Sequence, residues 1–104
     1  PAFASGWLGQ SEADFQAALL GFAKPEGWEH FHVHDSRRSP SGFPDLVLRH
    51  PTRPLLVLEL KREGEKPTPP QIAWLEAFID AGITARCVQP SDWEWIRDRL
   101  TGRT

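Results

Sequence analysis

The sequence predicts an α/β fold in which helices flank a mixed β-sheet, in the order helix, three strands, helix, strand, helix. Residues 45–50 and 55–61 are strand-like and are separated by a short Pro-Thr-Arg-Pro turn, which predicts a hairpin. A helical segment then separates the third strand from the fourth, and such a crossover makes those two strands parallel. The 104 residues suit one domain, expected over residues 1–104.

The first half of the chain carries a helix signal and then a strand signal. Residues 11–24 are expected to be helical, because Ser11 is a good N-cap, Asp14 takes the capping-box position and apolar residues follow helical spacing. Residues 28–35 alternate, which predicts a strand. One face would carry Phe31 and Val33, and the other would carry His30, His32 and His34.

The second half has clearer helix starts. Thr68 is expected to cap a helix with Pro69 at its first position and Gln71 completing a capping box, and Gly82 ends it. Residues 83–89 predict the fourth strand. The Ser91-x-x-Glu94 pattern predicts the cap of a final helix. The core-facing residues of that helix would be Trp93, Ile96 and Leu100.

Composition excludes some classes of protein. The net charge is −2, which argues mildly against a nucleic-acid binder, yet seven basic residues gather between positions 37 and 66 and could form a local phosphate-binding surface. Cys87 is the only cysteine, so an intrachain disulfide or a cysteine zinc cluster is impossible. No apolar run reaches the roughly 18 residues of a membrane helix, and no signal peptide is apparent. We expect a cytoplasmic protein without a membrane partner.

The third strand carries an acid and an amine on one face. Glu59 and Lys61 follow four consecutive apolar residues, and Asp45 begins the preceding strand, so the hairpin should bring the two carboxylates together away from its turn. Converging carboxylates need a cation, either Lys61 or a divalent metal. Two acids, a lysine and open water positions suit phosphodiester hydrolysis.

These residues carry a resemblance to a known family. The pattern Pro44-Asp45 … Glu59-Leu60-Lys61 resembles the PD-(D/E)XK nucleases, and residues 11–96 look like the VRR-NUC branch, especially its small stand-alone bacterial and phage members. Gly42 and Gln71 stand at the matching spacings. The family's Val-Arg-Arg is missing as such.

The resemblance implies a restriction-endonuclease-like core and a Mg²⁺- or Mn²⁺-dependent endonuclease acting on branched DNA, such as Holliday junctions, or duplex DNA, as a homodimer. It implies metal ligation by Asp45, Glu59 and the Leu60 carbonyl, with Glu12 reaching the metal through water. Lys61 would be the catalytic lysine, and Gln71, at the start of the helix facing the site, would be a further catalytic residue. The expected DNA contacts are His34, Arg37, Arg38, Arg62 and Lys66.

Structural alternatives stand beside these roles. Glu59 and Lys61 could be an ion pair on an edge strand, Gln71 could serve its capping box alone, and Glu12 could favour the first turn through the helix dipole. The three histidines could bind a transition metal or form a half-solvated face. A second hypothesis for function is a DNA-binding module of the same fold that does not cut.

Overall fold

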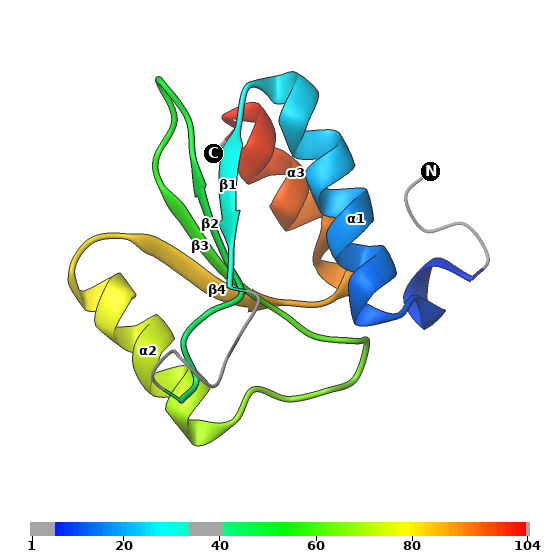
Figure 1. The fold of residues 1–104 in the computed structure, drawn as a ribbon, viewed down its shortest axis with the longest axis vertical. Coiled ribbons are helices and arrows are strands. Elements are labelled where there is room, and N and C mark those ends of the chain that lie inside the picture. Colours follow the sequence, from blue (N-terminus) through cyan, green and yellow to red (C-terminus); the bar gives the residue numbers. More distant parts are fainter. Residues whose placement is uncertain (1–5, 34–40, 104) are drawn as a thin grey trace.

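A computed structural model describes residues 6–33 and 41–103. Their centre is a four-stranded sheet in the order β1-β2-β3-β4 (Figure 1). The strands are β1 (Glu29–His32), β2 (Leu46–Arg49), β3 (Leu56–Leu60) and β4 (Thr84–Val88). The α-helices are α1 (Glu12–Ala23), α2 (Pro69–Asp80) and α3 (Trp93–Thr101), and the 3₁₀ turns are η1 (Trp7–Gly9), η2 (Lys24–Glu26) and η4 (Pro90–Asp92).

The sheet is mixed, as the sequence predicts. β2 pairs antiparallel with β1 and with β3, whereas β3 and β4 run parallel on either side of the α2 crossover. All five residues of β3 are buried, because this strand has neighbours on both edges and helices on both faces. The α/β class, the hairpin and the order of elements are therefore confirmed.

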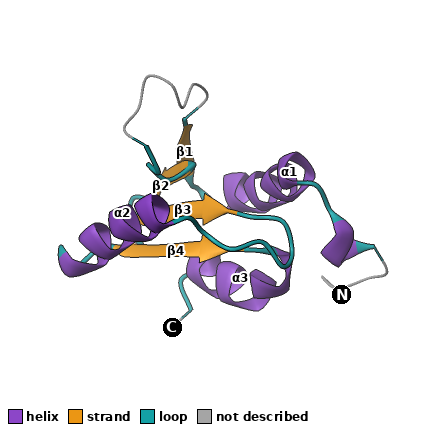
Figure 2. Ribbon diagram, turned by 90° about the horizontal axis from the view of Figure 1, so that it is seen from below, coloured by secondary structure: helices purple, strands orange, loops and turns teal. Residues whose placement is uncertain are grey.

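The helices divide between the two faces of the sheet. Figure 2 shows α1 and α3 on one side and α2 on the other. Phe15, Leu19, Ile96 and Leu100 belong to the larger core on the first side, together with the even-numbered residues of β3. Val57 faces the other way, into a smaller cluster with Leu75 and Ala85. Alternation along β3 therefore places the odd-numbered positions, including Glu59, on the side of α2.

Two helix starts agree with their sequence signals. The Ser11 side chain accepts from the Asp14 N–H at 3.1 Å. Thr68 and Gln71 form both halves of a capping box at α2. The cap predicted at Ser91 is wrong, because Pro90–Asp92 first form a 3₁₀ turn and α3 begins only at Trp93. There, Asp92 turns back and its Oδ2 accepts from the Gln89 N–H at 2.9 Å.

Phe31 is exposed, although it lies on the face of its strand that the sequence predicts to carry the apolar residues. Phe31 pairs with Val47 across the β1–β2 ladder and is 67% exposed. The physical reason is that α2 packs over β3 and β4 and leaves β1 uncovered on this side (Figure 1). β1 ends at His32, and His34 lies outside the described residues. Within the described part of the chain, no helix combines the length and apolar character needed to cross a membrane.

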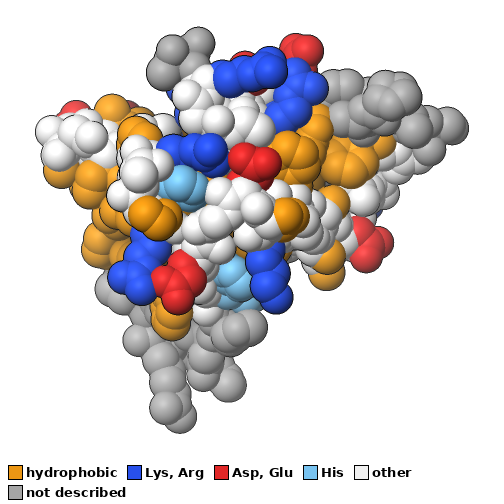
Figure 3. Space-filling view, turned by 90° about the horizontal axis from the view of Figure 1, so that it is seen from above, with side chains coloured by type: hydrophobic (Ala, Val, Ile, Leu, Met, Phe, Trp, Pro, Cys, Tyr) orange, Lys and Arg blue, Asp and Glu red, His pale blue; other side chains and the backbone are white. Residues whose placement is uncertain are grey.

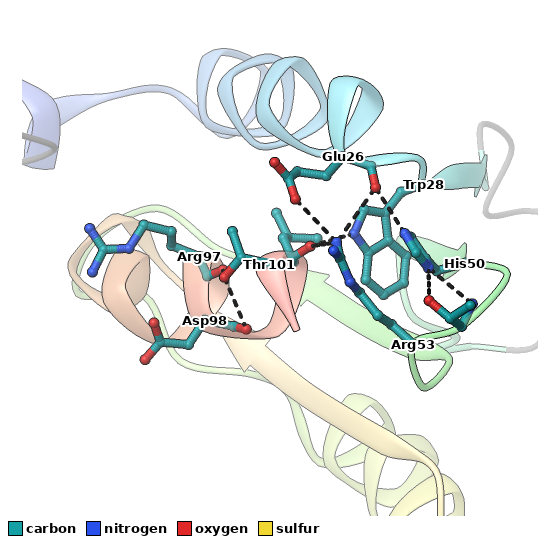
Figure 4. A network of polar contacts seen from close by, with 9 residues as sticks. Glu26, Trp28, His50, Arg53, Arg97, Asp98 and Thr101 are labelled. Atoms are coloured by element: carbon teal, nitrogen blue, oxygen red, sulfur yellow. Dashed lines mark hydrogen bonds and ion pairs between the residues drawn. The ribbon is translucent and has the colours of Figure 1, made fainter. Parts of the chain in front are cut away.

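The end of the sheet near the β2–β3 turn is held by a polar network (Figure 4). The Arg53 guanidinium donates to the Leu100 carbonyl at 2.6 Å and pairs with the Glu26 carboxylate at 3.1 Å, which ties the turn to the ends of η2 and α3. Trp28 donates to the same Leu100 carbonyl at 2.8 Å. Basic, acidic and histidine side chains are intermixed on the surface at this end (Figure 3). We assign this network a structural role.

Gly42 allows the segment before β2 to lie against the start of α2. Its φ is +84°, and a Cβ added there would lie 2.5 Å from the Pro70 carbonyl carbon and 2.7 Å from the Gln71 nitrogen. Neighbouring aromatic contacts join the same two segments, with the rings of Phe43 and Trp74 centred 5.0 Å apart. Only glycine satisfies both the positive φ and the close backbone approach.

Replacing Gly42 with alanine should lower the free energy of unfolding by about 1–3 kcal/mol or more, because backbone strain and a backbone clash combine. Urea denaturation would measure this loss. The matched control is Gly21→Ala in α1, where an added Cβ meets nothing within 4 Å. That substitution should instead stabilise the protein by up to about 1 kcal/mol, through helix propensity. Equal stabilities for the two variants would contradict this account of Gly42.

Candidate active site

The candidate site lies where β2 begins and β3 ends, away from the turn that joins them. Leu46 pairs with Leu58, so the same register continued by one residue places Asp45 opposite Glu59. The Leu60 N–H donates to Asp45 Oδ2 at 2.9 Å, which holds this carboxylate against the end of β3. The sequence therefore placed the two carboxylates correctly. The bond occupies the Leu60 N–H, and metal ligation by the Leu60 carbonyl stays a prediction.

Glu59 is the buried charge of the site, with 3% of its surface exposed. Burial, together with the charge of the neighbouring Asp45, raises the pKa of Glu59 to about 8, against a smaller opposing effect of Lys61. One oxygen, Oε2, accepts from Gln71 Nε2 at 3.0 Å. The other, Oε1, is buried and has no hydrogen-bond partner within residues 6–33 and 41–103.

Gln71 serves the capping box and the site at once. Its Oε1 accepts from the Thr68 N–H at 2.8 Å, and this bond fixes which end of the amide faces away from the helix. Nε2 is thereby directed at the Glu59 carboxylate. The two alternatives left open for Gln71 are thus compatible, because the cap uses the amide oxygen and the site contact uses the amide nitrogen. Its catalytic role stays a prediction.

Lys61 and Glu12 are two further charged side chains near the pair of carboxyls. Lys61 follows β3, and its Nζ lies 3.9 Å from Glu59 Oε2, with 17% of the side chain exposed. Because Glu59 lies in a central strand, the alternative of an ion pair on an edge strand is excluded. Glu12, in the first turn of α1, has a raised pKa, through partial burial and then the charge of Asp45. The charge of Asp45 thus acts on Glu12, which places Glu12 near the same site.

The donors fit a hard divalent cation held by two acids. Two carboxylates converge, and one buried oxygen of Glu59 lacks a hydrogen donor, which matches a Mg²⁺ site completed by water and substrate. Across the described residues, no three His, Cys, Asp or Glu side chains gather closely enough to hold a metal. Glu12 is thus left as a ligand through water at most, and this role stays a prediction. The described histidines likewise form no such group.

The predicted DNA contacts fall into two groups. Arg62 and Lys66 are exposed on the loop that follows Lys61, and Lys66 lines a cleft of about 190 Å³ together with Lys61. His34, Arg37 and Arg38 lie outside the described residues, so their contacts with DNA stay predictions.

Cys87 lies beside the site without a reactive character. It stands opposite Glu59 in the β3–β4 register and is half-buried rather than fully in the core. Burial, and then the charge of Glu59, raises the pKa of the Cys87 thiol to about 11. The thiol therefore stays protonated at neutral pH.

Gln89 and Asp92 are residues that the sequence interpretation missed. Gln89 accepts from the Gly64 N–H at 2.8 Å, on the loop that continues from Lys61, and Asp92 fixes Gln89 through its backbone. The only local signal is the acid three residues after Gln89, which fits a reciprocal cap. The contact with Gly64 joins distant parts of the chain and has no signature in the sequence.

Comparison with known proteins identifies the family. A family model described as the VRR-NUC domain matches residues 8–92. The chain belongs to the VRR-NUC family. A solved structure titled "VRR_NUC domain" superposes with a TM-score of 0.66 and 25% identity, over 75% of this chain and 83% of that one. The family resemblance drawn from the motif is therefore confirmed.

Two curated proteins are similar to part of the chain. Both are named Fanconi-associated nuclease 1 homolog, from Caenorhabditis elegans at 46% identity and from Caenorhabditis briggsae at 44%, each over 50 residues. The matched segment is 47% of this chain and 6% of each relative. The likeness therefore concerns a small portion of much longer proteins.

The raised pKa of Glu59 makes a prediction for stability without metal. The folded state holds the Glu59 proton up to about pH 8, whereas the unfolded state releases it near pH 4.5, so stability should fall as pH rises between these values. Urea denaturation in EDTA at pH 5 and pH 8 would measure this. Glu59→Gln should remove most of the fall.

The control for this titration is Glu76→Gln, which removes an exposed carboxylate of α2 and should keep the pH dependence of the wild type. If Glu59→Gln follows the wild-type curve at both pH values, the Glu59 carboxyl does not hold an extra proton in the folded state.

Proposed function

We propose that this VRR-NUC protein is a Mg²⁺- or Mn²⁺-dependent endonuclease that hydrolyses phosphodiester bonds in DNA. Membership of the family supports a nuclease, as do the names of the two partly matching relatives. The observation that carries the proposal is the buried Glu59 carboxyl, whose Oε1 lacks a donor among the described residues while Asp45 and Lys61 lie beside it. Burying a charged carboxylate in this way is unfavourable unless a proton or a cation compensates it.

Each residue of the site has a role in this proposal. Asp45 and Glu59 would hold the divalent cation with the Leu60 carbonyl, and Gln71 would keep Glu59 in the required orientation through its 3.0 Å bond. The bound cation would supply an activated water and neutralise charge on the phosphate. Lys61 would donate to a phosphate oxygen and stabilise the negative charge that develops on it.

The substrate and assembly are further parts of the proposal. We place the protein in the cytoplasm, acting on branched or duplex DNA with a preference for structure over sequence. Exposed Arg62 and Lys66 beside Lys61 would contact backbone phosphates, and such contacts carry no sequence information. Cutting two strands of a junction symmetrically requires two sites, so we propose a homodimer with two-fold symmetry.

Cleavage of labelled four-way junction, flap, duplex and single-stranded DNA tests the proposal. Wild-type protein should cut in Mg²⁺ or Mn²⁺ and not in EDTA. Asp45→Ala should abolish cutting, and Lys61→Ala should slow it by at least about 100-fold while leaving DNA binding largely intact. Lys24→Ala, which removes an exposed lysine of η2, is the matched control and should cut like the wild type.

The outcomes separate the two hypotheses for function. Binding of DNA with no cutting of any substrate would favour a non-cleaving DNA-binding module of this fold. Cutting that survives in Lys61→Ala would show that the lysine is misassigned.

Metal binding can be tested without activity. Mg²⁺ or Mn²⁺ should raise the melting temperature of the wild-type protein, because a ligand that binds only the folded state stabilises it. The rise should be larger at pH 8 than at pH 5, since the cation displaces the proton held by Glu59. Glu59→Gln should lose most of the rise, and Glu76→Gln should keep it. An unchanged rise in Glu59→Gln would place the cation elsewhere.

A further inference from the structure

Residues 61–68 form the loop that joins the two halves of the candidate site, and we call it the lysine loop. It begins with Lys61 at the end of β3 and ends with Thr68, which caps α2 and binds Gln71. Arg62 and Lys66 are exposed along it. The lysine loop contains no regular secondary structure, so contacts with other elements must hold it in place.

Two side chains tie the middle of the lysine loop to the β4–α3 junction. Gln89 Oε1 accepts from the Gly64 N–H at 2.8 Å. In the reverse direction, Glu63 Oε1 accepts from the Ser91 N–H at 2.9 Å. Within the loop itself, the Glu65 N–H donates to the Arg62 carbonyl at 3.0 Å, which closes a turn around Gly64. The loop is therefore a closed turn that rests on a second segment.

Asp92 and Arg86 in turn support Gln89. Its N–H donates to Asp92 Oδ2 at 2.9 Å, and the other oxygen of Asp92 accepts from Arg86 at 3.2 Å. The Arg86 guanidinium lies 4.7 Å from the ring centre of Trp95, on α3. A continuous set of contacts thus runs from α3 through β4 to the Gly64 amide. Such support fixes the backbone of the residue whose side chain accepts from the loop.

We propose that Gln89 is a positioning residue, which holds the lysine loop so that Arg62 and Lys66 meet DNA phosphates beside Lys61. The proposal rests on the proposed nuclease function, for which these residues are the expected phosphate contacts. Gln89 lines the same cleft of about 190 Å³ as Lys61 and Lys66. The side chain that holds the loop and these two lysines therefore border one space. Gln89 is expected to touch neither the cation nor the reacting phosphate.

The test compares Gln89→Met, which removes the acceptor at similar volume, with Gln89→Glu, which keeps an oxygen at the same reach. Amide hydrogen exchange in EDTA, without DNA, should show faster exchange at Gly64 in Gln89→Met and protection in Gln89→Glu. Unchanged exchange at Gly64 in Gln89→Met would show that Gln89 does not hold the lysine loop in place.

DNA binding then tests the consequence of the anchor. With a labelled duplex in EDTA, Gln89→Met should weaken binding several-fold, and the slope of log affinity against log salt should fall by about one for each phosphate that the loop no longer binds. In Mg²⁺, KM should rise while kcat changes little. Gln89→Glu should restore the salt slope at least partly. Faster Gly64 exchange with unchanged affinity and slope would overturn the positioning role.

Arg53→Met is the control for a general loss of stability. Arg53 holds the opposite end of the sheet, so its removal should destabilise the protein. Once this loss of global stability is taken into account, the exchange rate at Gly64 should be that of the wild type. The salt slope of DNA binding should also be unchanged. If Arg53→Met reproduces the changes of Gln89→Met, the effect arises from stability and the proposal fails. Absence of all cleavage by the wild type would overturn the proposed function. The exchange and binding measurements would still decide whether Gln89 holds the lysine loop in place.

Discussion

The burial of the Glu59 carboxyl in a central strand is the constraint on which the rest of the site depends. Its neighbours on β3 are apolar and its exposed fraction is 3%, so the charged form is disfavoured and the pKa rises to about 8. The contacts around it moderate this effect without removing it, since Gln71 and Lys61 both approach Oε2. In the function proposed above, the proton held by Glu59 is the one that a bound cation would displace.

The fold was predictable because its signals are local or periodic. The hairpin followed from two strand-like segments and a short turn, and α2 followed from Thr68, Pro69 and Gln71. The register that places Asp45 opposite Glu59 followed from the same hairpin. The failures arose where a competing local turn, or the packing of helices on the sheet, overrides a pattern in the sequence. Ser91 does not cap α3 because Gln89 and Asp92 form a turn there, and Phe31 is exposed because α2 covers only the other half of the sheet.

The candidate site was predictable to a similar extent and for similar reasons. A motif of acids and a lysine specifies residue types, and the hairpin geometry then brings them together. The tie between Gln89 and Gly64 spans 25 residues and uses a backbone N–H, which no pattern of side chains reveals. The double use of Gln71 was visible only as two competing interpretations, because the sequence does not show which end of an amide points where.

The site is assembled from a short continuous stretch of chain. Asp45 bonds to a residue 15 positions later, and Glu59 bonds to one 12 positions later, so residues 45–71 contain both contacts. Closing such short loops loses little chain entropy, and contacts between near neighbours in sequence form quickly during folding. The β2–β3 hairpin and the first turn of α2 therefore make a compact unit in which the proposed cation site can take shape early, before α3 completes the opposite face of the sheet.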